Sequence, residues 1–292
     1  MDDVPATAEG GDVFLHAPSC LPDAVASTVG YESNEPSPRF HRGLPSPYLT
    51  FIISMHQPVI VGDSATQLAR GDSERLDMVA AGLHISAQYI EQTVGQAGIQ
   101  LAVHPLAARR LFGVPAAELV GATYDGADVL GPVARTVREE LVDARDWVHR
   151  FRRLDSFLSE RAVRNETALI RPEVAEAWRW LTQRQGTGAI GDLARHVFMS
   201  PRQLQTLFHR EVGVGLKTYN RLLRFHRTVR TITDTAASGR RIDLAAIASS
   251  CGFADHAHMT RDFLSFTGAT PSGWMAEELG NIRAGGHRNG DR

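Results

Sequence analysis

The stretch that decides the fold is IGDLARHVFMSPRQLQTLFHREVG, which runs from Ile190 to Gly213. Its first part, up to Val197, has the apolar spacing of a short helix. A second, longer helix is predicted from Ser200, because Ser200 as N-cap, Pro201 at the first helical position and Gln203 two residues later form a capping box. A short helix, a tight turn and a longer helix make up a helix-turn-helix unit.

The same pattern returns 54 to 55 residues later, so the region holds an internal repeat. A bundle of ordinary helical hairpins has no reason to repeat both the turn and the Phe-x4-Gly ending. The corresponding positions are Leu193-Ala194 and Ile247-Ala248, Leu204 and Met259, Phe208 and Phe263, Gly213 and Gly268, and Tyr219 and Trp274.

A basic helix is predicted between the two units, from Leu216 to Thr233. At 1.5 Å per residue it would measure roughly 27 Å. A connector of this size can hold two recognition helices about one DNA turn apart, roughly 34 Å. One chain could then read two adjacent segments of the major groove.

The charge is divided unevenly along a chain of 292 residues whose net charge is −2. Residues 1–170 hold 14 Arg and 22 acidic residues, a balance of −8, whereas residues 171–292 hold 16 Arg, Lys217 and 11 acidic residues, a balance of +6. The near-neutral sum alone would argue against nucleic acid as a partner, but its parts indicate an acidic module joined to a module that faces a polyanion.

The predicted fold class is α+β, with a β-containing N-terminal regulatory domain ahead of an all-α domain that has two helix-turn-helix motifs and a linker helix. Residues 1–39, rich in Pro, Ser, Gly and acidic residues, are expected to be a flexible arm, and residues 281–292 a disordered tail. The regulatory domain is expected over 40–168 and the helical domain over 172–280. Strands are predicted at 48–55, 59–61, 78–86, 89–94 and 99–103, short helical pieces at 106–112 and 115–120, and one or two amphipathic helices within 133–164. Further helices are predicted at 173–182, 244–250, 255–267 and 270–278.

The second copy of the unit is IASSCGFADHAHMTRDF at 247–263, followed by GATPSGW at 268–274. Together with Ile190–Gly213, it resembles the double helix-turn-helix of the AraC/XylS transcription regulators. The resemblance covers about residues 172–280 and implies a transcription factor that binds double-stranded promoter DNA. Phe198 departs from the family, which often has Gly in this turn. If the turn needs a positive φ, Phe198 is strained there by about 1 kcal/mol or more; another turn conformation is the alternative.

The N-terminal half resembles the sensor-like domains that precede such DNA-binding domains in actinobacterial-type regulators. The residues that carry this likeness are FHRGLPSPY at 40–48, GIQLAVHP at 98–105, LFGVP at 111–115 and Glu118-Leu119. The likeness implies effector binding, dimerisation or both. A small-molecule effector, a homodimer and a contact with RNA polymerase are therefore open as partners, as is activation versus repression.

Residues that face outward on the two recognition helices are the candidate DNA contacts. Arg202 has the geometry to pair with guanine and Gln205 with adenine, and the resemblance places Arg202, Gln205 and Thr206 at base-facing positions. Lys217 and Arg224 are candidates for phosphate contacts, with an intradomain ion pair as the alternative for Arg224. The full set is Ser200, Arg202, Gln203, Gln205, Thr206, His209, Lys217, Arg224, His256, His258, Thr260 and Arg261.

No catalytic or metal-binding residues and no cofactor are predicted, and the sequence leaves open which residues would bind one. His256 and His258 diverge by about 200° on a helix, which disfavours chelation, and His41, His56, His84 and His104 lack the grouping of a cupin metal site. A zinc-thiolate DNA-repair enzyme would need a Cys cluster, but the cysteines are Cys20 and Cys251. The alternatives are a protein–protein adaptor and a metal-dependent cupin-like activity. Because the pattern shows neither a signal peptide nor a membrane span, we expect a cytoplasmic protein. We also expect that it is not an enzyme.

Overall fold

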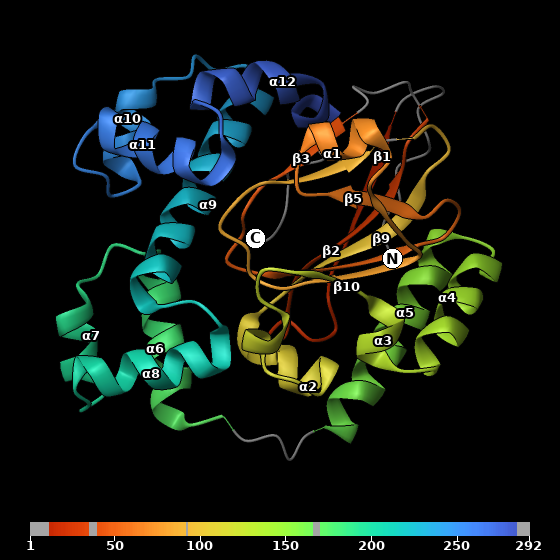
Figure 1. Cartoon of the computed structure of the whole chain (residues 1–292), viewed down its shortest axis with the longest axis horizontal. Coiled ribbons are helices and arrows are strands. Elements are labelled where there is room, and N and C mark those ends of the chain that lie inside the picture. The colour runs from red at the N-terminus through yellow and green to blue at the C-terminus, as the bar shows by residue number, and fades with distance from the viewer. Residues whose placement is uncertain (1–11, 35–39, 92, 166–169, 285–292) are drawn as a thin grey trace.

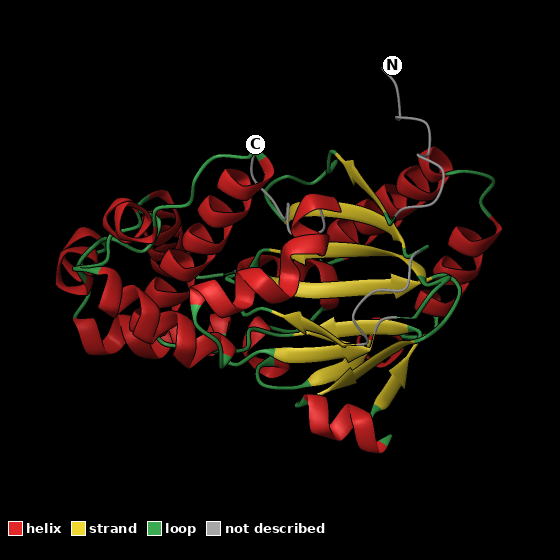
Figure 2. Cartoon of the chain, turned by 90° about the horizontal axis from the view of Figure 1, so that it is seen from above, coloured by secondary structure: helices red, strands yellow, loops and turns green. Residues whose placement is uncertain are grey.

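The computed structural model describes residues 12–34, 40–91, 93–165 and 170–284. Its N-terminal region, residues 12–165, contains two antiparallel sheets, and its helical region, residues 170–284, lies to one side of them (Figures 1 and 2). The six-stranded sheet has the order β1-β2-β9-β4-β7-β10 and the four-stranded sheet the order β3-β8-β5-β6. The strands are β1 Val13–Ala17, β2 Val25–Glu32, β3 Phe40–Gly43, β4 Leu49–Ser54, β5 Val59–Gly62, β6 Glu74–Leu76, β7 Met78–Ala81, β8 Gln88–Glu91, β9 Ala97–Val103 and β10 Thr123–Asp125.

Both faces of the six-stranded sheet are covered, as its central strand β4 shows. Leu49, Phe51 and Ile53 belong to the cluster that packs under the helices, whereas Ile52 packs against the four-stranded sheet. Since side chains alternate between the faces of a strand, one apolar run serves both layers. The elements of this region outside the sheets are α1 Ala65–Arg70, η1 Pro105–Ala107, α2 Ala108–Phe112, η2 Ala116–Leu119, α3 Gly126–Leu130, α4 Val133–Asp143 and α5 Trp147–Arg164.

The helical region has two cores along one long helix, α9 (Figure 1). The first core gathers α6, α7, α8 and the start of α9 around the buried Phe208 and Tyr219. The second gathers the rest of α9 with α10, α11 and α12 around the buried Phe263 and Trp274. These helices are α6 Pro172–Gln183, α7 Ile190–His196, α8 Pro201–Val212, α9 Leu216–Ala237, α10 Leu244–Ser250, α11 His256–Thr267 and α12 Pro271–Ala284.

The expectation of a flexible arm over 1–39 is wrong for residues 13–32, which form β1 and β2 inside the six-stranded sheet. Residues 1–11 lie outside the described residues. The strand expected over 78–86 ends at Ala81, and Gly82 follows where any Cβ would meet the backbone of Leu119 at 1.9 Å. This close approach leaves room for no side chain larger than that of glycine at position 82.

Two helices in the C-terminal half are longer than predicted. Helix α9 has 22 residues and continues past Thr233 to Ala237, and Gly239, at φ 66°, follows its end. Its length is therefore about 33 Å. Helix α12 extends to Ala284, so the expected tail over 281–292 is wrong for its first residues, and residues 285–292 lie outside the described residues.

Candidate nucleic-acid interface

Helix α8 starts with the capping box that the sequence predicts. The Ser200 hydroxyl oxygen accepts from the Gln203 backbone N–H at 3.3 Å, and the Gln203 side-chain oxygen accepts from the Ser200 N–H at 3.4 Å. Leu204 and Phe208 are buried one turn apart, which fixes the opposite face of the helix toward solvent. The exposed residues of that face are Arg202, Gln203, Gln205, Thr206 and His209, as predicted.

Three of these exposed side chains already have partners inside the domain, and one is Thr206, whose hydroxyl donates to the Arg202 carbonyl at 3.0 Å. The Gln203 amide belongs to the cap, and Gln205 accepts at its Oε1 from the backbone N–H of Leu216 at 3.1 Å. Gln205 therefore holds the first turn of α9, a role that sequence reasoning missed. Pairing of Gln205 with adenine would have to break this hydrogen bond. No partner is recorded for the Arg202 guanidinium among the described residues.

Helix α11 repeats the arrangement with another N-cap. The Asp255 carboxylate accepts from the His258 N–H at 2.6 Å, while Met259 and Phe263 are buried. His258 is half-buried with its ring edge-on to Phe253, at 5.3 Å between centroids. His258 thus serves the core as well as the surface. His256 lies 3.4 Å from the Thr260 hydroxyl, and Arg261 is exposed at the position that corresponds to Thr206 in the first unit.

The two helix-turn-helix turns share one backbone geometry. Phe198 in the first turn has φ 55° and Gly252 in the second has φ 79°. In each turn the following residue, Met199 or Phe253, donates its N–H to the carbonyl of an alanine five positions back, at 3.0 Å. The first turn therefore does take the positive φ, and the Phe198 side chain is 96% exposed.

On α9, the two residues predicted to contact phosphates lie in different surroundings. Lys217 is exposed. Arg224 lies 3.8 Å from the buried Asp262 and 5.3 Å above the Phe253 ring, so it joins α9 to the second unit. Arg221 reaches the same carboxylate at 3.0 Å. The ion-pair alternative for Arg224 is the one that the geometry favours.

The C-terminal ends of both recognition helices contact the N-terminal region. At the end of α8, Arg109 of α2 pairs with Glu211 at 2.7 Å, and Gly213 faces Val120. At the end of α11, Arg42 of β3 bonds the Thr267 carbonyl and pairs with Glu277 of α12 at 3.0 Å. The N-terminal ends of α8 and α11 point away from this contact (Figure 1).

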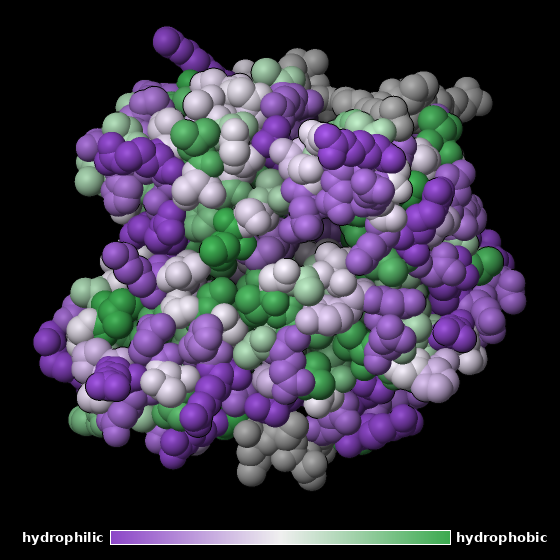
Figure 3. All heavy atoms as spheres, in the orientation of Figure 1, coloured by the Kyte–Doolittle hydropathy of each residue, from purple (hydrophilic) through white to green (hydrophobic). Residues whose placement is uncertain are grey.

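The surface of the helical region is largely hydrophilic on the face that Figure 3 shows. Hydrophilic side chains gather over both helix-turn-helix units, and the outline is indented between the two units.

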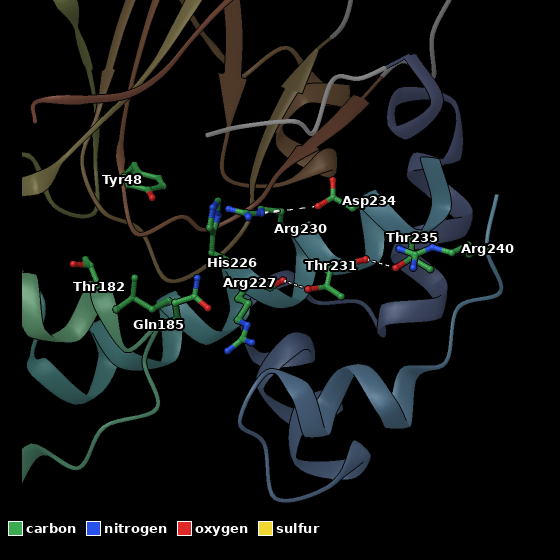
Figure 4. A pocket seen from close by; sticks show the side chains of 11 residues that line it. Tyr48, Thr182, Gln185, His226, Arg227, Arg230, Thr231, Asp234, Thr235 and Arg240 are labelled. Atoms are coloured by element: carbon green, nitrogen blue, oxygen red, sulfur yellow. Dashed lines mark hydrogen bonds and ion pairs between the residues drawn. The ribbon is translucent and has the colours of Figure 1, made fainter. Parts of the chain in front are cut away.

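Two pockets that share His226 and Arg230 lie against α9. The larger, about 390 Å³, runs along α9 from Gln185 to Arg240. Figure 4 shows His226 and Arg230 pointing from α9 toward the N-terminal region, whereas Arg227 extends from another side of the helix. The smaller, about 170 Å³, opens between the sheets, is lined by apolar residues such as Ile52 and Val79, and is closed by α9 through the same two residues, His226 and Arg230.

His84 lies on the wall of the smaller pocket. Its Nε2 atom is buried with no hydrogen-bond partner recorded, and burial lowers the pKa of the ring below its usual value, so His84 is neutral near pH 7. Among the described residues, no group of three or more His, Cys, Asp or Glu could hold a metal ion. Likewise, none of the described helices combines the length and apolar character needed to cross a membrane.

Comparison with known proteins identifies the helical region. Residues 193–277 match the family described as "Helix-turn-helix domain". The Arabinose operon regulatory proteins of Salmonella typhimurium and Escherichia coli are 29% identical to this chain over 87 residues, which is 30% of this chain. The C-terminal domain is a helix-turn-helix domain of the AraC type. The match to these two regulators covers 29% and 28% of their lengths, so it concerns this AraC-type domain alone.

Solved structures resemble the chain over a longer span. The structure of ToxT from Vibrio cholerae in its P21 form is 12% identical, with a TM-score of 0.46 over 86% of this chain and 97% of ToxT. An apo structure of a ToxT variant, from Vibrio cholerae strain SCE256, gives a TM-score of 0.49 at 12% identity and the same coverage.

Proposed function

We propose that the chain is a sequence-specific DNA-binding transcriptional regulator of the AraC type. The single observation that carries the proposal is the repeat: two complete helix-turn-helix units, each with an exposed polar recognition face, joined by a helix of about 33 Å. That length approaches the pitch of DNA, about 34 Å, so α8 and α11 can enter successive major grooves on one side of the duplex.

The contacts divide into those that position the protein and those that specify sequence. Arg202, with no partner recorded in the part of the chain that the structure describes, is the first candidate to pair with a guanine, and Arg261, at the position equivalent to Thr206, is the candidate on the second unit. Lys217 supplies charge for phosphates. Arg224 is left out of this set because Asp262 and Phe253 already hold it.

A band-shift titration against the chain's own promoter DNA, at two or more salt concentrations, tests the proposal. We expect a complex that prefers one sequence and weakens as salt rises, since phosphate contacts release counterions. Weak binding without sequence preference at physiological salt would instead favour the adaptor function, which the helical repeat also allows.

We further propose that a small-molecule effector binds in the smaller pocket and acts through α9. The pocket offers apolar walls, the Nε2 atom of His84 without a recorded partner, and Arg230 at its rim. An apolar molecule with one anionic or hydrogen-bonding group suits these features. Because α9 closes the pocket and also joins the two units, a ligand there would bias how the recognition helices are held.

The effector proposal is tested with a series of aliphatic carboxylates and the matching alcohols. Binding should raise the unfolding temperature and change DNA affinity in the wild-type chain. The substitution Ile52→Trp, which fills the pocket, should abolish both effects. An unchanged response in Ile52→Trp would place the ligand elsewhere.

A further inference from the structure

Phe198 has two properties that folding does not explain. Its backbone lies in the left-handed region, at φ 55°, which is unfavourable for a side chain with a Cβ. Its ring is 96% exposed, so it gains no packing within the chain in return. Strained backbone positions cluster at functional sites, so the exposed Phe198 ring on such a backbone points to a role in binding rather than in folding.

The second turn shows what this geometry requires when only folding matters. Its equivalent position is Gly252, at φ 79°, where an added Cβ would lie 2.6 Å from Cγ2 of Thr187. Glycine fits that turn because it accepts the positive φ and because it has no Cβ to meet Thr187. The first turn has the same hydrogen-bond pattern but enough space for a side chain, and it carries phenylalanine.

The location of Phe198 indicates the partner. It precedes the N-cap of α8 by two residues and Arg202 by four, and the N-terminal end of α8 is the end that points away from the sheets (Figure 1). In the proposed complex, the N-terminal residues of the recognition helix contact base edges. Phe198 therefore lies beside the duplex whenever Arg202 reaches a base.

We propose that the Phe198 ring packs against an apolar surface of the DNA at the edge of the site read by α8. DNA offers such a surface as the thymine methyl group or as the face of a deoxyribose. The contact adds affinity, and in the thymine case sequence preference, without adding charge. This inference rests on the proposed function.

The test uses the full chain and a DNA site selected from random sequences by the wild-type protein. We expect Phe198→Gly to weaken binding to that site about three- to tenfold, the scale of one lost apolar contact. Phe198→Leu, which keeps an apolar side chain, should retain most of the affinity. The slope of log affinity against log salt should stay unchanged, because no phosphate contact is lost.

Stability separates a lost contact from a folding defect. Phe198→Gly should unfold at the same temperature as the wild type or higher, since glycine accepts φ 55° and the exposed ring leaves no cavity. Weaker DNA binding in a protein of equal or greater stability would support the proposal. Wild-type affinity in Phe198→Gly would overturn it.

Uracil in place of each thymine of the selected site identifies the surface that is contacted. If a single thymine methyl matters to the wild type and not to Phe198→Gly, the ring packs on that methyl; if none does, it packs on the sugar. Failure of the wild type to select any site would remove the proposed function itself. That outcome is distinct from a selected site that Phe198→Gly binds normally.

Discussion

Arg202 is the residue whose removal should change sequence preference most. It is exposed at the start of α8, and no partner recorded among the described residues competes for its guanidinium. We expect Arg202→Ala to cost about 1–3 kcal/mol of binding free energy and to relax preference at one base position. Competition titrations against single-base variants of the site measure this, and an equal loss on every sequence would contradict a base contact.

Lys217 provides the matched contrast to Arg202. As an exposed amine at the start of α9, it can contact a phosphate but carries no base information. Lys217→Ala should weaken binding to all sequences alike and reduce the salt slope by about 1. A loss confined to the selected site would assign Lys217 a different role.

Single residues also show where sequence reasoning succeeds. The Ser200–Gln203 capping box follows from residues three apart, so it is readable from the sequence and is confirmed. The hydrogen bond from Leu216 to Gln205 joins residues 11 apart across a turn. No local pattern reveals such a contact, because it depends on how α8 and α9 pack.

At the scale of elements, the join between α9 and α11 depends on Asp262. This buried carboxylate accepts from Arg221 at 3.1 and 3.0 Å and faces Arg224. Asp262→Ala would leave two partly buried guanidinium groups without their carboxylate, so we expect a loss of about 2–4 kcal/mol in unfolding free energy. Urea unfolding measures this.

The control for Asp262 is Asp192→Ala, whose ion pair with Arg195 is exposed on α7. Its removal should change the unfolding free energy by less than about 0.5 kcal/mol. Equal effects of the two substitutions would show that the Asp262 cluster does not hold the units together.

In this chain the sequence predicts the helices better than the strands. The C-terminal helices have apolar residues at helical spacing over 7 to 22 residues, and α8, α10 and α11 also have side-chain N-caps, so their positions follow from the sequence. Strands β1 and β2 escape sequence reasoning because they lie in a segment rich in Pro and Ser. Strands β6 and β10, of three residues each, are too short to show alternation.

At the scale of the whole molecule, Arg109 ties the first unit to the N-terminal region. Its partner Glu211 lies 102 residues away, which explains why no sequence pattern indicates the contact. Arg109→Ala should cost about 1–3 kcal/mol of stability, because Glu211 is left half-buried without its partner. Differential scanning calorimetry should show the loss, and the exposed Arg195→Ala is the matched control.

The most direct test of the central claim is a methylation-interference footprint of the full chain on its selected DNA site. Two helix-turn-helix units on one helix of about 33 Å predict two groups of major-groove contacts on one face of the duplex, about one helical turn apart. A single group of contacts, or two groups on opposite faces, would contradict the claim that one chain reads two successive grooves.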